Sequence, residues 1–259
     1  MFFDSHAHYD DEAFCEDREE LLSSMNQNGI EYIMNVGASM KSTEASIKLA
    51  EQYAFIYAAA GVHPSETETL KDEDMQRLKE YAGHEKVKAI GEIGLDYHYK
   101  EPDKEIQKKW FRRQLDIARE VRLPVIIHSR DAAKDTFDLL KEYEGEIEGG
   151  VIHCFSYSAD LAEEYLKMGY YIGIGGVLTF HNAKKLKEVA ELIPINRIVL
   201  ETDCPYLSPE PYRGKRNTSV NLPYVAAELA KIKGLSDTEV INITCRNAMK
   251  LYGIGCKEN

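Results

Sequence analysis

The residues best suited to chemistry in this chain are two histidines separated by a single residue near its start. His6 and His8 stand in the sequence Asp-Ser-His-Ala-His at positions 4–8. Side chains two residues apart on a strand point to the same face, so both imidazoles can reach one metal ion. Further histidines and acids stand at the ends of apolar runs along the rest of the chain: His63, Glu92, His128, His153, Glu201 and Asp203. This pattern indicates a metal-dependent hydrolase.

Short apolar, β-branched runs alternate with amphipathic charged segments, and these elements must position the histidines and acids. The expected strands are 2–6, 32–36, 56–62, 87–93, 124–128, 150–155, 170–175 and 197–201. The expected helices are 15–28, 41–52, 70–82, 104–121, 132–143, 159–168, 183–192 and 222–233. A final helix, 236–252, begins with a capping box and is expected to pack on the outside.

Strands that alternate with helices pair in parallel, and eight such units close a sheet into a barrel. We therefore predict an α/β fold, a TIM-type (β/α)8 barrel with an extra C-terminal helix, built as a single domain over residues 1–259. A doubly wound open sheet is the competing architecture. Such a sheet usually carries a Gly-rich phosphate loop after its first strand, and this chain has neither that loop nor a Walker motif. We expect no nucleotide cofactor.

The overall composition is that of an ordinary globular protein. Hydrophobic residues make up 44% of the chain and charged residues 29%, which is enough apolar material for a sizeable core. The formal net charge of -12 argues against a protein that passively coats nucleic acid, because such affinity comes from lysines and arginines that displace counterions. It does not exclude an enzyme that acts on nucleic acid, since bound divalent cations cancel local negative charge.

The cysteines and the chain start point to a reduced compartment. The five cysteines lack the C-x-x-C spacing of a zinc ribbon or redox pair. Cys154 and Cys204 directly follow His153 and Asp203, so strand alternation predicts that they face the helix layer as small core residues. The chain shows no signal-peptide pattern and no membrane-length apolar run. We expect a cytoplasmic protein without a membrane partner, and a monomer is the favoured state.

In a barrel of this kind the C-terminal ends of the strands build the site. The first and eighth strands become neighbours on closure, so Asp203 is expected beside His6 and His8. Glu92 would come from the opposite side, where its two oxygens can bridge two ions about 3.5–4 Å apart. The ligands then divide into two sets, each containing Glu92: His6, His8, Glu92 and Asp203 for one ion, and Glu92, His128 and His153 for the other.

The chain resembles the amidohydrolase-type metal barrels and, more closely, the TatD family of metal-dependent deoxyribonucleases. The resemblance covers essentially the whole chain. It is carried by Asp-Ser-His-Ala-His (4–8), Gly-Val-His-Pro (61–64), Gly-Glu-Ile-Gly-Leu-Asp-Tyr (91–97), Ile-Ile-His-Ser-Arg (126–130), His-Cys-Phe-Ser (153–156), Glu-Thr-Asp-Cys-Pro-Tyr-Leu (201–207) and Arg-Gly-Lys-Arg-Asn (213–217). Many amidohydrolases have a carboxylated lysine where this chain has Glu92, and the glutamate agrees with the TatD pattern.

The resemblance implies a divalent-metal-dependent phosphodiesterase that acts on DNA, trimming single strands from the 3′ end. Asp203 would accept a proton from the attacking water, and His63 would contact substrate, transfer a proton or serve a structural role. Glu201 would orient the base or hold a further cation, and its alternative is a buried acid paired with an arginine or lysine of the barrel. The family's activity is usually associated with magnesium or manganese. Imidazole-rich ligation favours zinc or manganese on grounds of ligand softness, so zinc is a candidate ion in crystals.

A basic loop follows the eighth expected strand and offers phosphate contacts through Arg213, Lys215 and Arg216. Its alternative interpretation is a solvated loop. Three aromatic residues offer faces for an unpaired base or are plain packing: Tyr206, Phe155 and Tyr212.

Two alternative functions stay open at this point. One is hydrolysis of a small amide, lactone or phosphoester, because the fold does not determine the substrate. The other is a non-catalytic metal-binding or quality-control protein.

Overall fold

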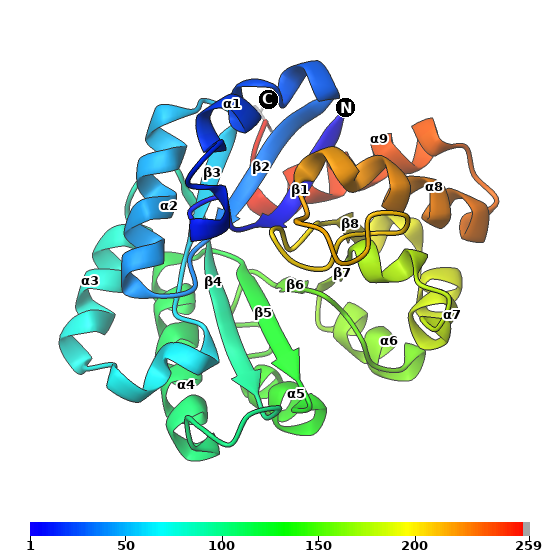
Figure 1. Ribbon diagram of the computed structural model, residues 1–259. Coiled ribbons are helices and arrows are strands. Elements are labelled where there is room, and N and C mark those ends of the chain that lie inside the picture. The colour runs from blue at the N-terminus through cyan, green and yellow to red at the C-terminus, as the bar shows by residue number, and fades with distance from the viewer. Residues whose placement is uncertain (256–259) are drawn as a thin grey trace.

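The computed structural model describes residues 1–255, in which eight parallel strands alternate with helices and follow one another around the sheet in chain order (Figure 1). The strands are β1 (Phe2–Ala7), β2 (Ile30–Val36), β3 (Ile56–Ala60), β4 (Val87–Asp96), β5 (Val125–Arg130), β6 (Gly150–Ile152), β7 (Tyr171–Ile174) and β8 (Ile198–Leu200). The helices are α1 (Arg18–Ser23), α2 (Met40–Gln52), α3 (Asp72–Ala82), α4 (Lys104–Val121), α5 (Ala133–Glu142), α6 (Ala159–Lys167), α7 (Lys184–Leu192), α8 (Leu222–Lys233) and α9 (Asp237–Tyr252). The predicted TIM-type barrel with a C-terminal helix is confirmed.

The barrel closes between its first and last strands at the C-terminal rim. The backbone N–H of Asp203 donates to His6 O at 2.9 Å, and the N–H of His8 donates to Cys204 O at 2.8 Å. Ala7 and Cys204 form the parallel bridge between these bonds. The joint therefore lies beside the His-x-His pair.

One cluster of buried side chains takes residues from all eight strands but none from α1–α8, so it fills the inside of the barrel. It also includes four side chains of α9: Cys245, Ala248, Leu251 and Tyr252. The Tyr252 hydroxyl donates to Ser5 O, and its ring lies 5.7 Å from the ring of Phe3, near the start of β1. The expectation that this helix packs outside is therefore wrong, because its apolar face covers the N-terminal end of the barrel.

Two strands carry a β-bulge at a residue of the expected site. In β1 the stretch between Asp4 and Ala7, which contains His6, is one residue longer than the paired stretch of β2. In β4 the stretch between Ile90 and Ile93, which contains Glu92, is one residue longer than the paired stretch of β5. An extra residue reverses the side-chain alternation that follows it. The bulges consequently turn His6 and Glu92 to the inside of the barrel.

The helix expected over 15–28 is wrong as a continuous element. A 3-10 turn (Glu12–Phe14) precedes α1, and a second 3-10 turn (Asn26–Asn28) follows it. The asparagines have low helix propensity, and Gly29 ends the segment with a left-handed φ of 76°. No helix within residues 1–255 is both long and apolar enough to cross a membrane. Cys256 lies outside the described residues.

Candidate metal centre

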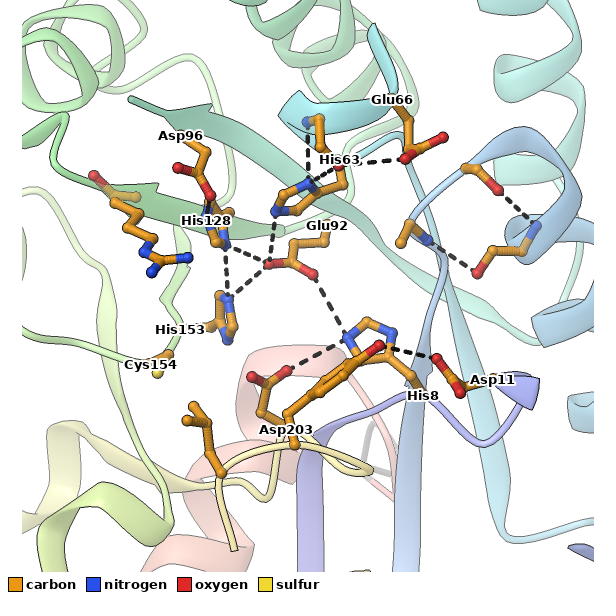
Figure 2. Close-up of a pocket in the computed structure, with 18 of the residues that line it drawn as sticks. His8, Asp11, His63, Glu66, Glu92, Asp96, His128, His153, Cys154 and Asp203 are labelled. Carbon is orange, nitrogen blue, oxygen red and sulfur yellow. Dashed lines mark hydrogen bonds and ion pairs between the residues drawn. The ribbon is translucent and has the colours of Figure 1, made fainter. Parts of the chain in front are cut away.

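Glu92 lies between two groups of histidines, and each of its carboxylate oxygens faces a different group. Figure 2 shows Glu92 with His128 and His153 on one side and His8 on the other. Its Oε1 lies 2.7 Å from both His128 Nδ1 and His153 Nε2. Its Oε2 lies 3.4 Å from His6 Nε2 and 3.6 Å from His8 Nε2. This carboxylate joins residues from β1, β4 and β5 with the residue that follows β6.

Asp203 completes a four-membered donor set with Glu92 and the first histidine pair. Its Oδ1 lies 3.6 Å from His6 Nε2 and 3.5 Å from His8 Nε2, and the two Nε2 atoms lie 3.0 Å apart. Ligands at about 2.1 Å from a tetrahedral ion lie ~3.4 Å from one another. The separations within this set match that value, so these four side chains fit a metal ion.

Two of the histidines are oriented by a bond at the ring nitrogen that faces away from Glu92. His8 Nδ1 donates to the backbone oxygen of Val36 at 2.8 Å, which leaves its Nε2 lone pair directed at the donor set. His128 Nε2 lies 3.1 Å from Asp96 Oδ2, which leaves its Nδ1 toward Glu92. Such outer partners determine the tautomer and orientation of metal-binding imidazoles.

The histidines of the cluster differ in their electrostatics, because burial lowers the pKa of His6 to about 4. Burial by itself lowers the pKa of His8, but its contacts with Asp203 and Glu92 outweigh burial and raise that pKa to about 9. In the same way the charge of Glu92 raises the pKa of His153 to about 10. Burial raises the pKa of Glu92 itself, yet the charges of His153 and His6 hold it well below its ordinary value. The carboxylates thus attract protons onto His8 and His153, and a divalent ion would take the place of these protons because metal-binding imidazoles are neutral.

Glu201 lies behind the histidines and is 1% exposed. Its Oε1 accepts the backbone N–H of Cys154 at 2.5 Å, while its Oε2 and the Nδ1 of His153 are buried without a hydrogen-bond partner among the described residues. Burial raises the pKa of Glu201 to about 7. A Cβ on Gly173 would lie 2.4 Å from Oε2, so only glycine leaves room for this carboxylate.

His63 lies at the rim, where it caps the 3-10 turn Pro64–Thr69. Its Nδ1 accepts the backbone N–H of Ser65 at 3.1 Å, and its Nε2 lies 3.9 Å from Glu92 Oε1. Burial and the neighbouring His128 lower the pKa of His63 to about 3. A neutral imidazole whose Nδ1 accepts a bond carries its proton on Nε2, so His63 presents a donor to the cavity.

A cavity of about 840 Å³ is bordered by most of these side chains, whereas the buried His6 and Glu201 do not line it. Among the residues predicted to contact substrate, Tyr206 lines this cavity and its hydroxyl donates to Asp11 at 3.0 Å. Phe155 and Tyr212 do not line it, since Phe155 is 2% exposed and Tyr212 contacts Tyr224.

The three predicted basic residues also lie outside the cavity lining. Arg216 pairs with Asp17, Arg213 lies over the ring of Phe180 at 4.3 Å, and Lys215 lies 5.7 Å from the ring of Tyr212. Their role in binding substrate stays a prediction.

Among the cavity residues that the sequence interpretation did not single out, Asp96 and Cys154 lie beside the histidines. Asp96 follows Glu92 by four residues on β4, so strand alternation puts both carboxylates on one face and was a usable signal. Cys154 also lines the cavity (Figure 2), so the prediction that it faces the helix layer is wrong. β6 ends at Ile152 and Cys154 has a left-handed φ of 46°, and alternation does not extend beyond a strand. Cys204 is buried as expected.

A family model for TatD-related DNases matches residues 3–253. The chain belongs to this family. It is 45% identical over 254 residues to YabD of Bacillus subtilis (strain 168), a protein named an uncharacterized metal-dependent hydrolase, and the match covers 98% of this chain and 100% of YabD. This member of the TatD-related DNase family is therefore a metal-dependent hydrolase.

Two further relatives bear on the fold and the substrate. The chain is 33% identical over 244 residues to the 3′-5′ ssDNA/RNA exonuclease TatD of Cronobacter sakazakii (strain ATCC BAA-894), which covers 92% of this chain and 93% of that protein. The crystal structure of YjjV, a TatD homologue from Escherichia coli K12, superposes with a TM-score of 0.92 at 32% identity and covers 98% of both chains. The family thus contains both named exonucleases and hydrolases without an assigned substrate.

Proposed function

We propose that this protein is a deoxyribonuclease that hydrolyses phosphodiester bonds with two divalent metal ions and trims single strands from the 3′ end. The observation that carries the proposal is Glu92, whose two oxygens face separate histidine pairs, as a ligand shared by two ions must do. The nucleic-acid substrate is supported by the family and by the named exonuclease relative. Magnesium or manganese is the proposed physiological ion.

Six side chains would hold the ions. One set is His6, His8, Glu92 and Asp203, and the other is Glu92, His128 and His153. Such a pair of ions, when bound, supplies an activated water and neutralises charge on the phosphate oxygens. The buried histidines and carboxylates supply nitrogen and oxygen ligands, and on grounds of softness this mixture favours manganese or zinc over magnesium.

The chain's own groups carry the proton and orient the phosphate. Asp203 accepts a proton from the attacking water. Its side chain borders the cavity, and its lowered pKa keeps the carboxylate ionised and able to take up that proton. The oxygen of that water bonds to phosphorus, the ester oxygen of the neighbouring nucleotide leaves, and the proton passes to that oxygen. His63 Nε2–H donates to a phosphate oxygen, and Glu201 holds the backbone of the His153 loop. No covalent intermediate with the protein is needed.

The test is the degradation of end-labelled single-stranded and double-stranded DNA with magnesium, manganese or zinc, each with and without chelator. We expect shortening of the single strand from its 3′ end that stops when chelator is added. Asp203→Asn should lower turnover by about 10²–10⁴, the range for loss of a proton-transferring group. Asp160 is an exposed residue of α6, so Asp160→Asn is the matched control and should behave as the wild type. No degradation under any of these conditions would overturn the proposal.

A small phosphoester, amide or lactone is the second candidate substrate. One observation favours it: six carboxylates, one arginine and no lysine line the cavity within the described residues, which is a poor match for a polyanion unless ions are bound. Turnover of bis(4-nitrophenyl) phosphate without degradation of any oligonucleotide would support this candidate. Metal binding with neither activity would instead support the non-catalytic alternative.

A further inference from the structure

One arginine among the described residues lines the cavity, and it is not in the basic loop. Arg130 ends β5, two residues after His128, so strand alternation directs both side chains to the same face. The other residues of the lining are carboxylates, histidines, small hydroxyl side chains and a few aromatic or apolar groups. Arg130 is therefore the point of the lining best able to attract a phosphate.

The guanidinium of Arg130 is exposed and makes no hydrogen bond or ion pair with any described residue. Its neighbour across the β4–β5 ladder is Asp96, but that carboxylate is already bonded to His128 and to the backbone N–H of His98. By contrast, Arg216 of the basic loop is paired with Asp17. An unpaired guanidinium presents all of its donors, and these match the oxygens of a phosphate.

An exposed aromatic ring lies beside this arginine. Tyr99 lines the cavity, is 61% exposed, and has its ring centroid 5.8 Å from the Arg130 guanidinium carbon. Three of the six exposed large hydrophobic side chains of the described chain border this cavity, namely Tyr99, Tyr206 and Leu207. Aromatic rings gathered at a cavity mouth offer stacking faces, and stacking is worth about 1–3 kcal/mol per base.

We propose that Arg130 and Tyr99 form a nucleotide subsite at the mouth of the cavity. Arg130 binds the phosphate next to the one that is cleaved, and Tyr99 stacks on the base of that nucleotide. The ligand class is a single strand of nucleic acid, whose unpaired bases leave a face open for stacking. This inference rests on the proposed function and names the residues that hold the strand in place of the loop at 213–217.

The test measures binding separately from turnover. Fluorescence anisotropy follows a labelled single-stranded oligonucleotide with phosphorothioate linkages, which slow its hydrolysis, on the manganese-loaded protein. Arg130→Ala should raise Kd about 5- to 100-fold and reduce the slope of log Kd against log salt by about 0.7, the value for one phosphate contact on a single strand. Arg77→Ala removes an exposed arginine on α3 and is the matched control with unchanged Kd and slope.

Tyr99 is tested with two substitutions that separate its ring from its hydroxyl. Tyr99→Ala should raise Kd about 5- to 100-fold, the loss of one stacked base, with an unchanged salt slope. Tyr99→Phe keeps the ring and should bind as the wild type. Both positions are exposed, and equal thermal midpoints in all variants check that the fold is kept.

The outcomes distinguish the subsite from the function. Wild-type affinity and slope in both Arg130→Ala and Tyr99→Ala, with the wild type still degrading DNA, would overturn the subsite and leave the function standing. A lower salt slope in Arg213→Ala but not in Arg130→Ala would assign phosphate binding to the basic loop, and this result would also overturn the subsite. A wild-type protein that neither binds nor degrades oligonucleotides would overturn the function and the subsite together.

Discussion

Glu92 is the residue on which both halves of the site depend, because one carboxylate serves two histidine pairs. Glu92→Gln replaces one oxygen by a nitrogen that carries no lone pair for a metal. We expect the metal content per chain, measured by elemental analysis, to fall at both positions. Turnover should fall more than about 100-fold, since loss of mere outer partners of metal ligands already costs 10–100-fold.

The matched control for Glu92→Gln is Glu66→Gln, an exposed acid of the same cavity that lies outside the donor sets. Its metal content should equal that of the wild type. Full metal occupancy and wild-type turnover in Glu92→Gln would remove Glu92 from the centre.

Glu201 predicts a pH dependence for the metal-free protein. Its folded pKa is about 7 because of burial, whereas an unfolded glutamate titrates at about 4.3. At pH values between these two pKa values the folded chain binds one proton more than the unfolded chain. The free energy of unfolding therefore falls by about 3 kcal/mol as the pH rises from the lower pKa to the higher one. Glu201→Gln keeps the acceptor for Cys154 N–H and should remove this part of the dependence. Urea unfolding in chelator at pH 5 and pH 8 measures the free energy of unfolding of the wild type and of Glu201→Gln. An identical pH dependence in these two proteins would contradict the prediction.

Residue types at strand ends led from the sequence to the histidines and acids that the structure brings together around Glu92, and their role as metal ligands stays a prediction. Asp96 and Cys154, which line the same cavity, were not predicted. Asp96 carried a usable signal in its spacing from Glu92. Cys154 carried none, because its left-handed backbone arises from the way the chain leaves β6 and leads on toward α6. The alternation of side chains predicts which face a residue lies on only within the strand and not beyond its end.

At the scale of elements, the order of strands and helices follows from periodic apolar runs and was predictable. The bulges in β1 and β4 were not, because an extra residue between two paired strands is defined by register with a neighbour rather than by local composition. The position of α9 was also hidden. Its amphipathic pattern indicates one buried face and does not say whether that face meets the outer helices or the barrel end.

A buried carboxylate connects the two elements that meet at the barrel joint. Asp4 on β1 accepts the backbone N–H of Thr202 at 3.0 Å, and it accepts the hydroxyls of Thr202 and Ser219, each at 2.6 Å. Thr202 directly precedes Asp203. The position of Asp203 therefore depends on a bond network that reaches across the joint.

Substitution of Asp4 tests this network. Asp4→Ala should lower the free energy of unfolding by about 3 kcal/mol, because it leaves buried donors without an acceptor. Asp4→Asn should cost less, since the hydroxyls of Thr202 and Ser219 can rotate and accept from the amide. Urea unfolding compares the two variants. Equal losses would show that the hydroxyls do not adapt in this way.

At the scale of the whole molecule, bound metal should stabilise the fold because its ligands come from both ends of the chain. One ion at 100 times its Kd adds about 2.7 kcal/mol. That corresponds to roughly 5–10 °C in Tm for a chain of this size. Calorimetry with chelator, then with metal restored, should show this shift and its reversal, and Glu92→Gln should show a smaller one. An equal Tm for the chelator-treated protein and the untreated protein would contradict the ligand assignment.

The joint between β1 and β8 also has a consequence for synthesis. His6 and His8 leave the ribosome early, and Asp203 follows about 200 residues later, which takes roughly 10–40 s at the usual rate of translation. Until then β1 has no eighth strand beside it, and Asp4 has neither Thr202 nor Ser219 to bind. A nascent or prematurely ended chain thus carries the first two histidines without the acid that completes their set. The order of translation delays a complete hydrolytic centre until nearly the whole barrel exists.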